Sequence, residues 1–361
     1  MRAYIRWALI LLWTGLLFGC AKASGPDFYV IEGRYLQVED KIHLSYPGSR
    51  FRVASNGDDI VIYVTATRPD LTLDMRVENG EWETIALTEG ENEIFPFGKP
   101  QDYNRGKWVD DPSTHRWQID LIRLNEAWQG DIIITGTHSY GILVPPNALP
   151  DKKLLFIGDS ITAGAGTTSR VNGQGEGEAV SNARLAYPRI LADRLNAQTH
   201  HIAYGGRGLT RDWQGIKETN NAPQFYDRVL PDNPDYLWDP QNYQADIVSV
   251  MLGTNDFNPG IPDRESWTRT YQDFVTRIRK DYPDAQIFLV SSPMTGGEKG
   301  DALKTYVKAV AESFNSPTVQ YLEVSQYYGE AWDAHPTAAE HEKIADELEA
   351  AFRQALESPG H

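Results

Sequence analysis

Ser160 is the residue of this chain whose type and place best fit covalent chemistry. It ends the run Leu-Phe-Ile-Gly-Asp-Ser over residues 155–160, where an apolar stretch gives way to glycine and an acid. A serine hydroxyl is a weak nucleophile at its own pKa, so it needs a histidine base and donors for the oxyanion that forms. Gly-Asp-Ser alone is common, and a serine there also suits the cap of a turn. Ser160 is therefore a candidate nucleophile only if a histidine base and oxyanion donors occur elsewhere in the chain.

Three further motifs supply those partners. Gly206 lies in Tyr-Gly-Gly-Arg-Gly over residues 204–208, where a missing side chain lets a backbone N–H approach a reacting oxygen; Gly205 is the alternative donor. Asn255, in Leu-Gly-Thr-Asn-Asp over residues 252–256, offers an uncharged amide donor. His335, in Trp-Asp-Ala-His-Pro over residues 332–336, would be the base.

The elements that must position these motifs alternate between strand and helix. Strands are expected over residues 154–158, 199–203, 246–252, 286–291 and 319–324, and helices over residues 187–196, 267–282, 302–314 and 337–356. This alternation predicts a parallel sheet covered by helices on both faces. Three motifs follow strands and the fourth precedes the last helix, so all four converge on the carboxyl edge, where such sheets bind ligands.

The part of the chain before residue 145 has a different pattern of apolar and turn residues. Short alternating apolar runs at residues 51–53, 60–65, 71–77, 117–124 and 132–135 are separated by turn signals such as Asn79-Gly80. This spacing predicts an all-β jelly roll or antiparallel β-sandwich over residues 26–144. Residues 145–152 read as a proline-rich linker, and residues 153–357 as the α/β domain.

The four blocks in this order resemble the SGNH (GDSL) hydrolase superfamily, whose namesake residues correspond to Ser160, Gly206, Asn255 and His335. That resemblance covers roughly residues 153–356 and implies a three-layer, flavodoxin-like α/β/α domain. The upstream β-sandwich, the joint from Pro145-Pro146 to Lys153-Leu154, the run 156–165 and the Asp-x-His-Pro ending are similar to carbohydrate esterase family 2. This narrower resemblance implies an esterase that removes O-acetyl groups from acetylated plant polysaccharides such as xylan and glucomannan.

Chemical roles follow from the residue types and agree with the resemblance. Ser160 would attack the acetyl carbonyl, and His335 would take its proton and return one to the departing sugar hydroxyl. The Ser160 and Gly206 N–H groups and the Asn255 amide would hold the oxyanion. An acetyl-enzyme would form and be hydrolysed.

The third member of the triad departs from the superfamily pattern. The usual aspartate lies three residues before the histidine, but Trp332 occupies that position and Asp333 lies only two before. Either Asp333 reaches the far nitrogen of His335, or a backbone carbonyl orients the ring and the site is a dyad. We favour Asp333.

The first residues have the features of an export signal. Arg2 and Arg6 precede a short apolar run, and residues 1–19 are followed by Cys20 in Leu-Phe-Gly-Cys. This arrangement resembles a bacterial lipoprotein box, which implies lipidation at Cys20 and attachment to the cell envelope; plain signal-peptide cleavage and secretion is the alternative. Cys20 is the only cysteine, so no intramolecular disulfide can form.

The charge and composition of the chain exclude several classes of binding partner. The formal net charge of −16 argues against nucleic acid and against a polybasic membrane patch, which leaves the lipid anchor as the expected membrane contact. The histidines show no metal-ligand spacing, so we expect neither a metal nor another cofactor, and we expect a monomer. Among the aromatics of residues 208–245, Trp213 and Trp238 are the candidates for stacking on sugar rings.

Two rival functions remain at this point. A lipase or thioesterase of the same superfamily would keep the chemistry and change the acyl group, but it would want a long apolar groove. A non-catalytic polysaccharide-binding lipoprotein would have no need of Ser160, Gly206, Asn255 and His335 together. The β-sandwich itself could bind glycan or only support the catalytic domain.

Overall fold

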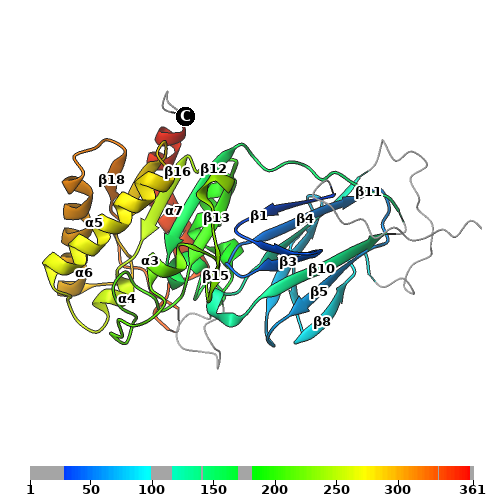
Figure 1. Ribbon diagram of the computed structural model, residues 1–361, viewed down its shortest axis with the longest axis horizontal. Helices are drawn as coiled ribbons and strands as arrows, with labels where there is room; N and C mark the ends of the chain where they lie inside the picture. Colours follow the sequence, from blue (N-terminus) through cyan, green and yellow to red (C-terminus); the bar gives the residue numbers. More distant parts are fainter. Residues whose placement is uncertain (1–27, 99–115, 140, 170–180, 332, 358–361) are drawn as a thin grey trace, which may run out of the picture.

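The computed structural model describes residues 28–98, 116–139, 141–169, 181–331 and 333–357. Figure 1 shows a β-sandwich beside a layered α/β part, with the C-terminal helix covering one side of the parallel sheet. The predicted fold class is thereby confirmed. Within the described ranges, no helix is both long and apolar enough to cross a membrane.

Two antiparallel sheets form the β-sandwich. Along the first sheet the order is β1 (Tyr29–Glu32), β4 (Arg50–Ser55), β9 (Trp117–Arg123), β6 (Thr72–Val77) and β7 (Glu83–Ala86), with β11 (Leu143–Val144) also paired to β4. The second contains β2 (Leu36–Val38), β3 (Lys41–Leu44), β10 (Ile132–Ser139), β5 (Ile60–Ala66) and β8 (Gly90–Ile94). Alternating apolar residues such as Ile62, Val64, Leu121 and Ile134 are buried between the sheets. A short 3₁₀ helix, η3 (Ala127–Gln129), follows β9.

The α/β part is built on a parallel five-stranded sheet. Its strands are β12 (Lys152–Gly158), β13 (Ala197–Ala203), β16 (Ile247–Met251), β17 (Gln286–Val290) and β18 (Val319–Leu322). They lie in the order β13-β12-β16-β17-β18, which is the flavodoxin-like order. The chain reverses direction across the sheet between β12 and β16, so a ligand site is expected at the carboxyl ends of these two strands.

Helices cover both faces of this sheet, as the sequence pattern predicts. The long helices are α2 (Tyr187–Arg194), α5 (Arg264–Asp281), α6 (Gly297–Ser313) and α7 (Ala338–Glu357). Leu155 and Ile157 of β12 pack with α5 and α6, whereas Leu154 and Phe156 pack with α2 and α7. The short elements are α1 (Ser160–Ala163), η4 (Ala183–Leu185), α3 (Ala222–Phe225), β14 (Arg228–Leu230), β15 (Asn233–Leu237), η5 (Pro240–Asn242) and α4 (Thr254–Phe257).

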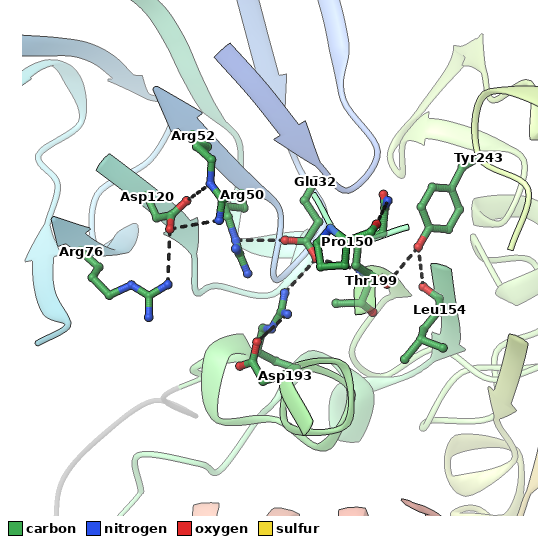
Figure 2. A network of polar contacts seen from close by, with 12 residues as sticks. Glu32, Arg50, Arg52, Arg76, Asp120, Pro150, Leu154, Asp193, Thr199 and Tyr243 are labelled. Carbon is green, nitrogen blue, oxygen red and sulfur yellow. Dashed lines mark hydrogen bonds and ion pairs between the residues drawn. The ribbon is translucent and has the colours of Figure 1, made fainter. Parts of the chain in front are cut away.

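A buried carboxylate joins the two parts. Glu32 of β1 is 1% exposed and lies 3.0 Å from Nε of Arg50 in its own sheet. It also accepts hydrogen bonds from Nη1 of Arg189 in α2 at 2.9 Å and from the N–H of Thr199 in β13 at 2.7 Å. Figure 2 shows Glu32 between Arg50 and Thr199, at the junction of the two parts. Burial acts to raise the pKa of Glu32, but the charges of Arg189 and Arg50 outweigh it and lower that pKa to about 2.

We expect Glu32→Gln to lower the free energy of unfolding by about 3 to 5 kcal/mol, because it leaves the buried guanidinium of Arg50 without its carboxylate and removes one of the two carboxylates that pair with Arg189. Since the folded-state pKa lies below the ordinary value of 4.5, this contribution is present above that pH and is lost as the pH falls toward 2. Urea denaturation at pH 7 and pH 4 measures it, with Glu93→Gln on the exposed side of β8 as the matched control. Equal midpoints for the two variants at pH 7 would contradict this prediction.

Candidate active site

Ser160 stands at the carboxyl end of β12, where the strand turns directly into α1. Asp159 caps this helix, and its Oδ1 accepts the N–H of Ile161 at 3.1 Å. The cap turns the chain sharply, so that Ser160 becomes the first helical residue at the edge of the sheet. Its hydroxyl therefore lies at the position that the sheet topology reserves for a ligand site.

His335 reaches Ser160 from the segment before α7. Its Nε2 lies 2.7 Å from Oγ of Ser160, the distance of a strong hydrogen bond. The start of α7 is held by a reciprocal cap, in which Glu340 accepts the N–H of Thr337 at 2.8 Å and Thr337 Oγ1 accepts the N–H of Glu340 at 3.3 Å. These two bonds make Thr337 the N-cap of α7.

Asp333 faces the other nitrogen of the same ring. Its Oδ2 lies 2.9 Å from Nδ1 of His335, although the ring N–H is not well directed at it, and its Oδ1 accepts the His335 backbone N–H at 3.3 Å. Ala334 between them has φ 63°, a left-handed conformation that turns both side chains toward each other. No carbonyl oxygen of the described residues is hydrogen-bonded to Nδ1. The geometry therefore favours the Asp333 alternative over a carbonyl-oriented dyad.

The surroundings of His335 favour its protonated form. Burial acts to lower the pKa of His335, but hydrogen bonding to Asp333 and the charges of Asp333, Glu126 and Asp159 outweigh burial and raise it above its ordinary value. Burial likewise acts to raise the pKa of Asp333, and the hydrogen bond and charge of His335 outweigh it and lower that pKa. The ring is thus arranged to accept a proton from Ser160.

The backbone donors predicted for the oxyanion lie in the same place. Gly206 has φ 74°, where a side chain would be strained, and a Cβ on it would lie 3.0 Å from Cδ1 of Trp213. In the parts of the chain that the structure covers, the N–H groups of Ser160 and Gly206 donate to no backbone or side-chain acceptor. Both are therefore free to bind a charged oxygen.

Asn255, the third predicted donor, follows β16 in α4 and lines the same cleft. Its Nδ2 donates to the carbonyl oxygen of Arg207 at 2.9 Å and lies 3.4 Å from Oδ2 of Asp159. The first bond orients the amide, while the longer contact leaves its second N–H weakly held. The neighbouring Asp256 instead braces the loop before it, because it accepts the N–H groups of Leu209 at 2.8 Å and Thr210 at 2.7 Å.

These side chains open into a cleft of about 640 Å³ that both parts of the molecule line. The α/β part contributes Ser160, His335 and Trp213, and the segment after β9 of the sandwich contributes Glu126 and Trp128. Sequence analysis missed these last two, because their motif carries no signal of its own and only the packing of the two parts brings it here. Among the described residues, no group of three or more His, Cys, Asp and Glu side chains could hold a metal ion.

The two tryptophans proposed to stack on sugars have different positions. Trp213 is 52% exposed and lines the cleft. Trp238 does not line it: its ring lies under the guanidinium of Arg34 at 5.0 Å and packs edge-on against His200. Trp238 is thus part of the contact between the sandwich and the α/β part, and this position does not support its predicted stacking on sugar. Cys20, predicted to be lipidated, lies outside the described residues.

The fold and this arrangement define a serine hydrolase of the SGNH type, and comparison with known proteins gives the family. Residues 156–354 match the model of the GDSL-like Lipase/Acylhydrolase family. The chain is 30% identical over 343 residues to an acetylxylan esterase / glucomannan deacetylase of Cellvibrio japonicus, covering 93% of this chain and 90% of that protein.

Solved structures agree with this match. A family two carbohydrate esterase from Cellvibrio japonicus superimposes with a TM-score of 0.84 at 30% identity, covering 92% of this chain and 96% of that one. A family two carbohydrate esterase from Clostridium thermocellum in complex with cellohexaose shares the fold, with a TM-score of 0.80 at 24% identity over 91% of this chain and 99% of that one. The chain belongs to the GDSL-like hydrolases and, within them, to carbohydrate esterase family 2, as its motifs suggested.

Proposed function

We propose that this carbohydrate esterase removes O-acetyl groups from plant cell-wall polysaccharides such as acetylated xylan and glucomannan, with Ser160 as nucleophile. The observation that carries the proposal is the 2.7 Å contact between Ser160 Oγ and His335 Nε2 in an open cleft. Similarity to an acetylxylan esterase / glucomannan deacetylase over 93% of this chain supports the substrate class.

The reaction proceeds through an acetyl-enzyme. Ser160 Oγ attacks the ester carbonyl as His335 Nε2 takes its proton, and a tetrahedral oxyanion forms. When this intermediate collapses, His335 gives the proton to the departing sugar oxygen, and the acetyl group stays on Ser160. Water then attacks, again losing a proton to His335, and acetate leaves as Ser160 recovers its hydrogen. Asp333 stabilises the imidazolium in both halves.

The oxyanion is held by the N–H groups of Ser160 and Gly206 together with the second N–H of Asn255. We expect Asn255→Ala to lower kcat for an acetyl ester by about 100-fold to 1000-fold, with little change in KM, because this donor acts mainly on the transition state. Steady-state kinetics measure it, with Asn220→Ala as control; the Asn220 amide binds the carbonyl of Pro231 at 2.6 Å outside the cleft. A loss below threefold would remove Asn255 from the oxyanion site.

Two tryptophans in the cleft wall favour an ester of a sugar. Trp128 is 42% exposed and Trp213 is 52% exposed, so both present indole surface to the cleft, and an apolar ring face is what stacks on sugar. Hydrolysis rates for acetyl and octanoyl esters of the same alcohol test the acyl preference. We expect a strong preference for acetyl; a preference for octanoyl would favour the lipase or thioesterase alternative.

The cellular site stays a proposal as well. The charged start, the short apolar run and Leu-Phe-Gly-Cys support export and lipidation at Cys20, which would hold the enzyme at the bacterial cell envelope. Incorporation of labelled palmitate that disappears in Cys20→Ala would support the anchor, and release of unlabelled protein into the medium would support secretion instead.

A further inference from the structure

A carboxyl group of the β-sandwich lies in the wall of the active-site cleft. Glu126 caps η3 directly after β9, is 3% exposed and lines the same cleft as Ser160 and His335. Oε1 accepts a hydrogen bond from Ser181 Oγ at 3.2 Å. Oε2 is buried and has no well-directed partner among the described residues. A buried carboxyl oxygen without a well-directed donor is costly, so its retention beside a reaction centre calls for a role.

The carboxyl group of Glu126 contacts the loop that carries the proposed oxyanion donor Gly206. A Cβ built on Gly205 would overlap Oε2 of Glu126, so the two groups are in direct contact. Gly205 precedes Gly206, whose N–H is one of the proposed donors. The position of the Glu126 carboxyl therefore sets how far this loop can move toward the sandwich.

Charged groups around Glu126 couple it to the proton that moves during catalysis. His335 and Asp159 are the titratable side chains of the α/β part that interact with its charge. Arg123 of β9 donates from Nη2 to the backbone carbonyl of Glu126 at 2.8 Å and leaves the carboxyl to other partners. Arg207, which lines the cleft, faces Asp212 at 3.6 Å.

The charge of Glu126 and that of His335 support each other. Burial raises the pKa of Glu126 to about 7, although the charge of His335 and hydrogen bonds from Ser181 and Trp128 act to lower it. In return, the negative charge of Glu126 acts to raise the pKa of His335. The charge of each group therefore acts on the pKa of the other.

We propose that Glu126 is a positioning residue of the active site, through which the β-sandwich holds the Gly205–Gly206 loop in place and directs a second negative charge at His335. When His335 Nε2 takes the proton of Ser160, this charge stabilises the imidazolium together with Asp333. The inference rests on the proposed function. It also gives the sandwich a part in catalysis, in addition to supporting the fold or binding glycan.

The decisive variant is Glu126→Gln, which keeps the shape and removes the charge. His335 must be neutral to act as a base, so the acidic limb of kcat/KM reports its pKa. Without Glu126 that pKa falls, and we expect the acidic limb to move to lower pH by roughly half a unit or more. We expect kcat at pH 8 to fall by about 5-fold to 20-fold, the smaller effect of a residue that acts through others.

Two further variants separate this role from a structural one. Glu126→Asp retains the charge, and we expect its acidic limb to stay near that of the wild type even if kcat falls. Asp131→Asn removes a sandwich carboxylate that binds Ser45 outside the cleft, and we expect no shift. A lower thermal midpoint for Glu126→Gln with an unmoved limb would mean that Glu126 serves only the fold.

A direct titration distinguishes failure of this inference from failure of the proposed function. The imidazole pKa of His335, followed by NMR in the Ser160→Ala background and assigned by loss of the signal in His335→Asn, should fall in Glu126→Gln. An unchanged His335 pKa would overturn the inference while leaving the esterase assignment intact. An inactive wild type with a shifted pKa would overturn the esterase assignment alone.

Discussion

Ser160→Ala is expected to lower kcat for hydrolysis of an acetyl ester by about 10⁴-fold to 10⁶-fold while the protein stays folded. The variant removes the only atom that can form the acyl-enzyme, and the remaining oxyanion donors and His335 can assist only a direct attack by water. Among the described residues, the hydroxyl of Ser160 forms a hydrogen bond only with His335. Removing this hydroxyl therefore disturbs little of the fold.

Initial rates of acetate release measure this effect, with Ser169→Ala as the matched control. Ser169 follows in the same loop region, where its N–H binds the carbonyl of Gly166 at 3.0 Å, and it does not line the cleft. Activity of Ser160→Ala within tenfold of the wild type would mean that another group attacks the ester.

Asp333→Asn should have the second-largest effect, a fall in kcat of about 100-fold to 10⁴-fold. The amide cannot stabilise the imidazolium and tends to hold the ring in the wrong tautomer, because its NH₂ group favours an unprotonated Nδ1. The lower limit of this expected fall in kcat is below that of a well-aligned triad, because the ring N–H of His335 is not well directed at Oδ2 of Asp333, although Oδ2 lies 2.9 Å from Nδ1. A loss of less than threefold would show that the site works as a dyad.

The pH dependence of kcat/KM gives a second, independent test of Asp333→Asn. Asp333 acts to raise the pKa of His335, so its removal lowers that pKa. The acidic limb of kcat/KM should then move to lower pH even as kcat falls, whereas Asp235→Asn on the exposed hairpin should leave both unchanged. A limb that moves to higher pH would contradict the electrostatic account of this pair.

The α/β part could be predicted well from the sequence because its central strands, β12 and β16, are mostly buried. Continuous apolar runs such as β12 and β16 leave few alternatives to a strand of a parallel sheet, and the helix patterns match one buried stripe each. Ser160, Gly206 and Asn255 all follow such strands, so the sheet edge brings them together almost automatically. The strands of the sandwich were found only where they were long; β2, β7 and β8 are short and largely exposed, so periodicity gave little signal.

Contacts between the two parts could not be predicted in this way. Glu126 and Trp128 belong by sequence to the sandwich, and only the packing of the parts brings them into the cleft. The position of Trp238 could not be predicted for the same reason, because the ring of this loop residue lies under Arg34 of the sandwich. The closeness of Asp333 to His335 depended on the left-handed Ala334 between them, a backbone conformation that no residue type in this segment announces.

The most direct measurement of the central claim is acetate release from acetylated xylan and acetylated glucomannan. The protein from Ala21 onward should be compared with its Ser160→Ala variant on both polymers. The account predicts release from at least one polymer by the wild type, and release at the level of the blank by the variant. If the wild type releases no acetate from either polymer, or the variant releases as much as the wild type, the assignment as a serine-dependent polysaccharide acetyl esterase is wrong.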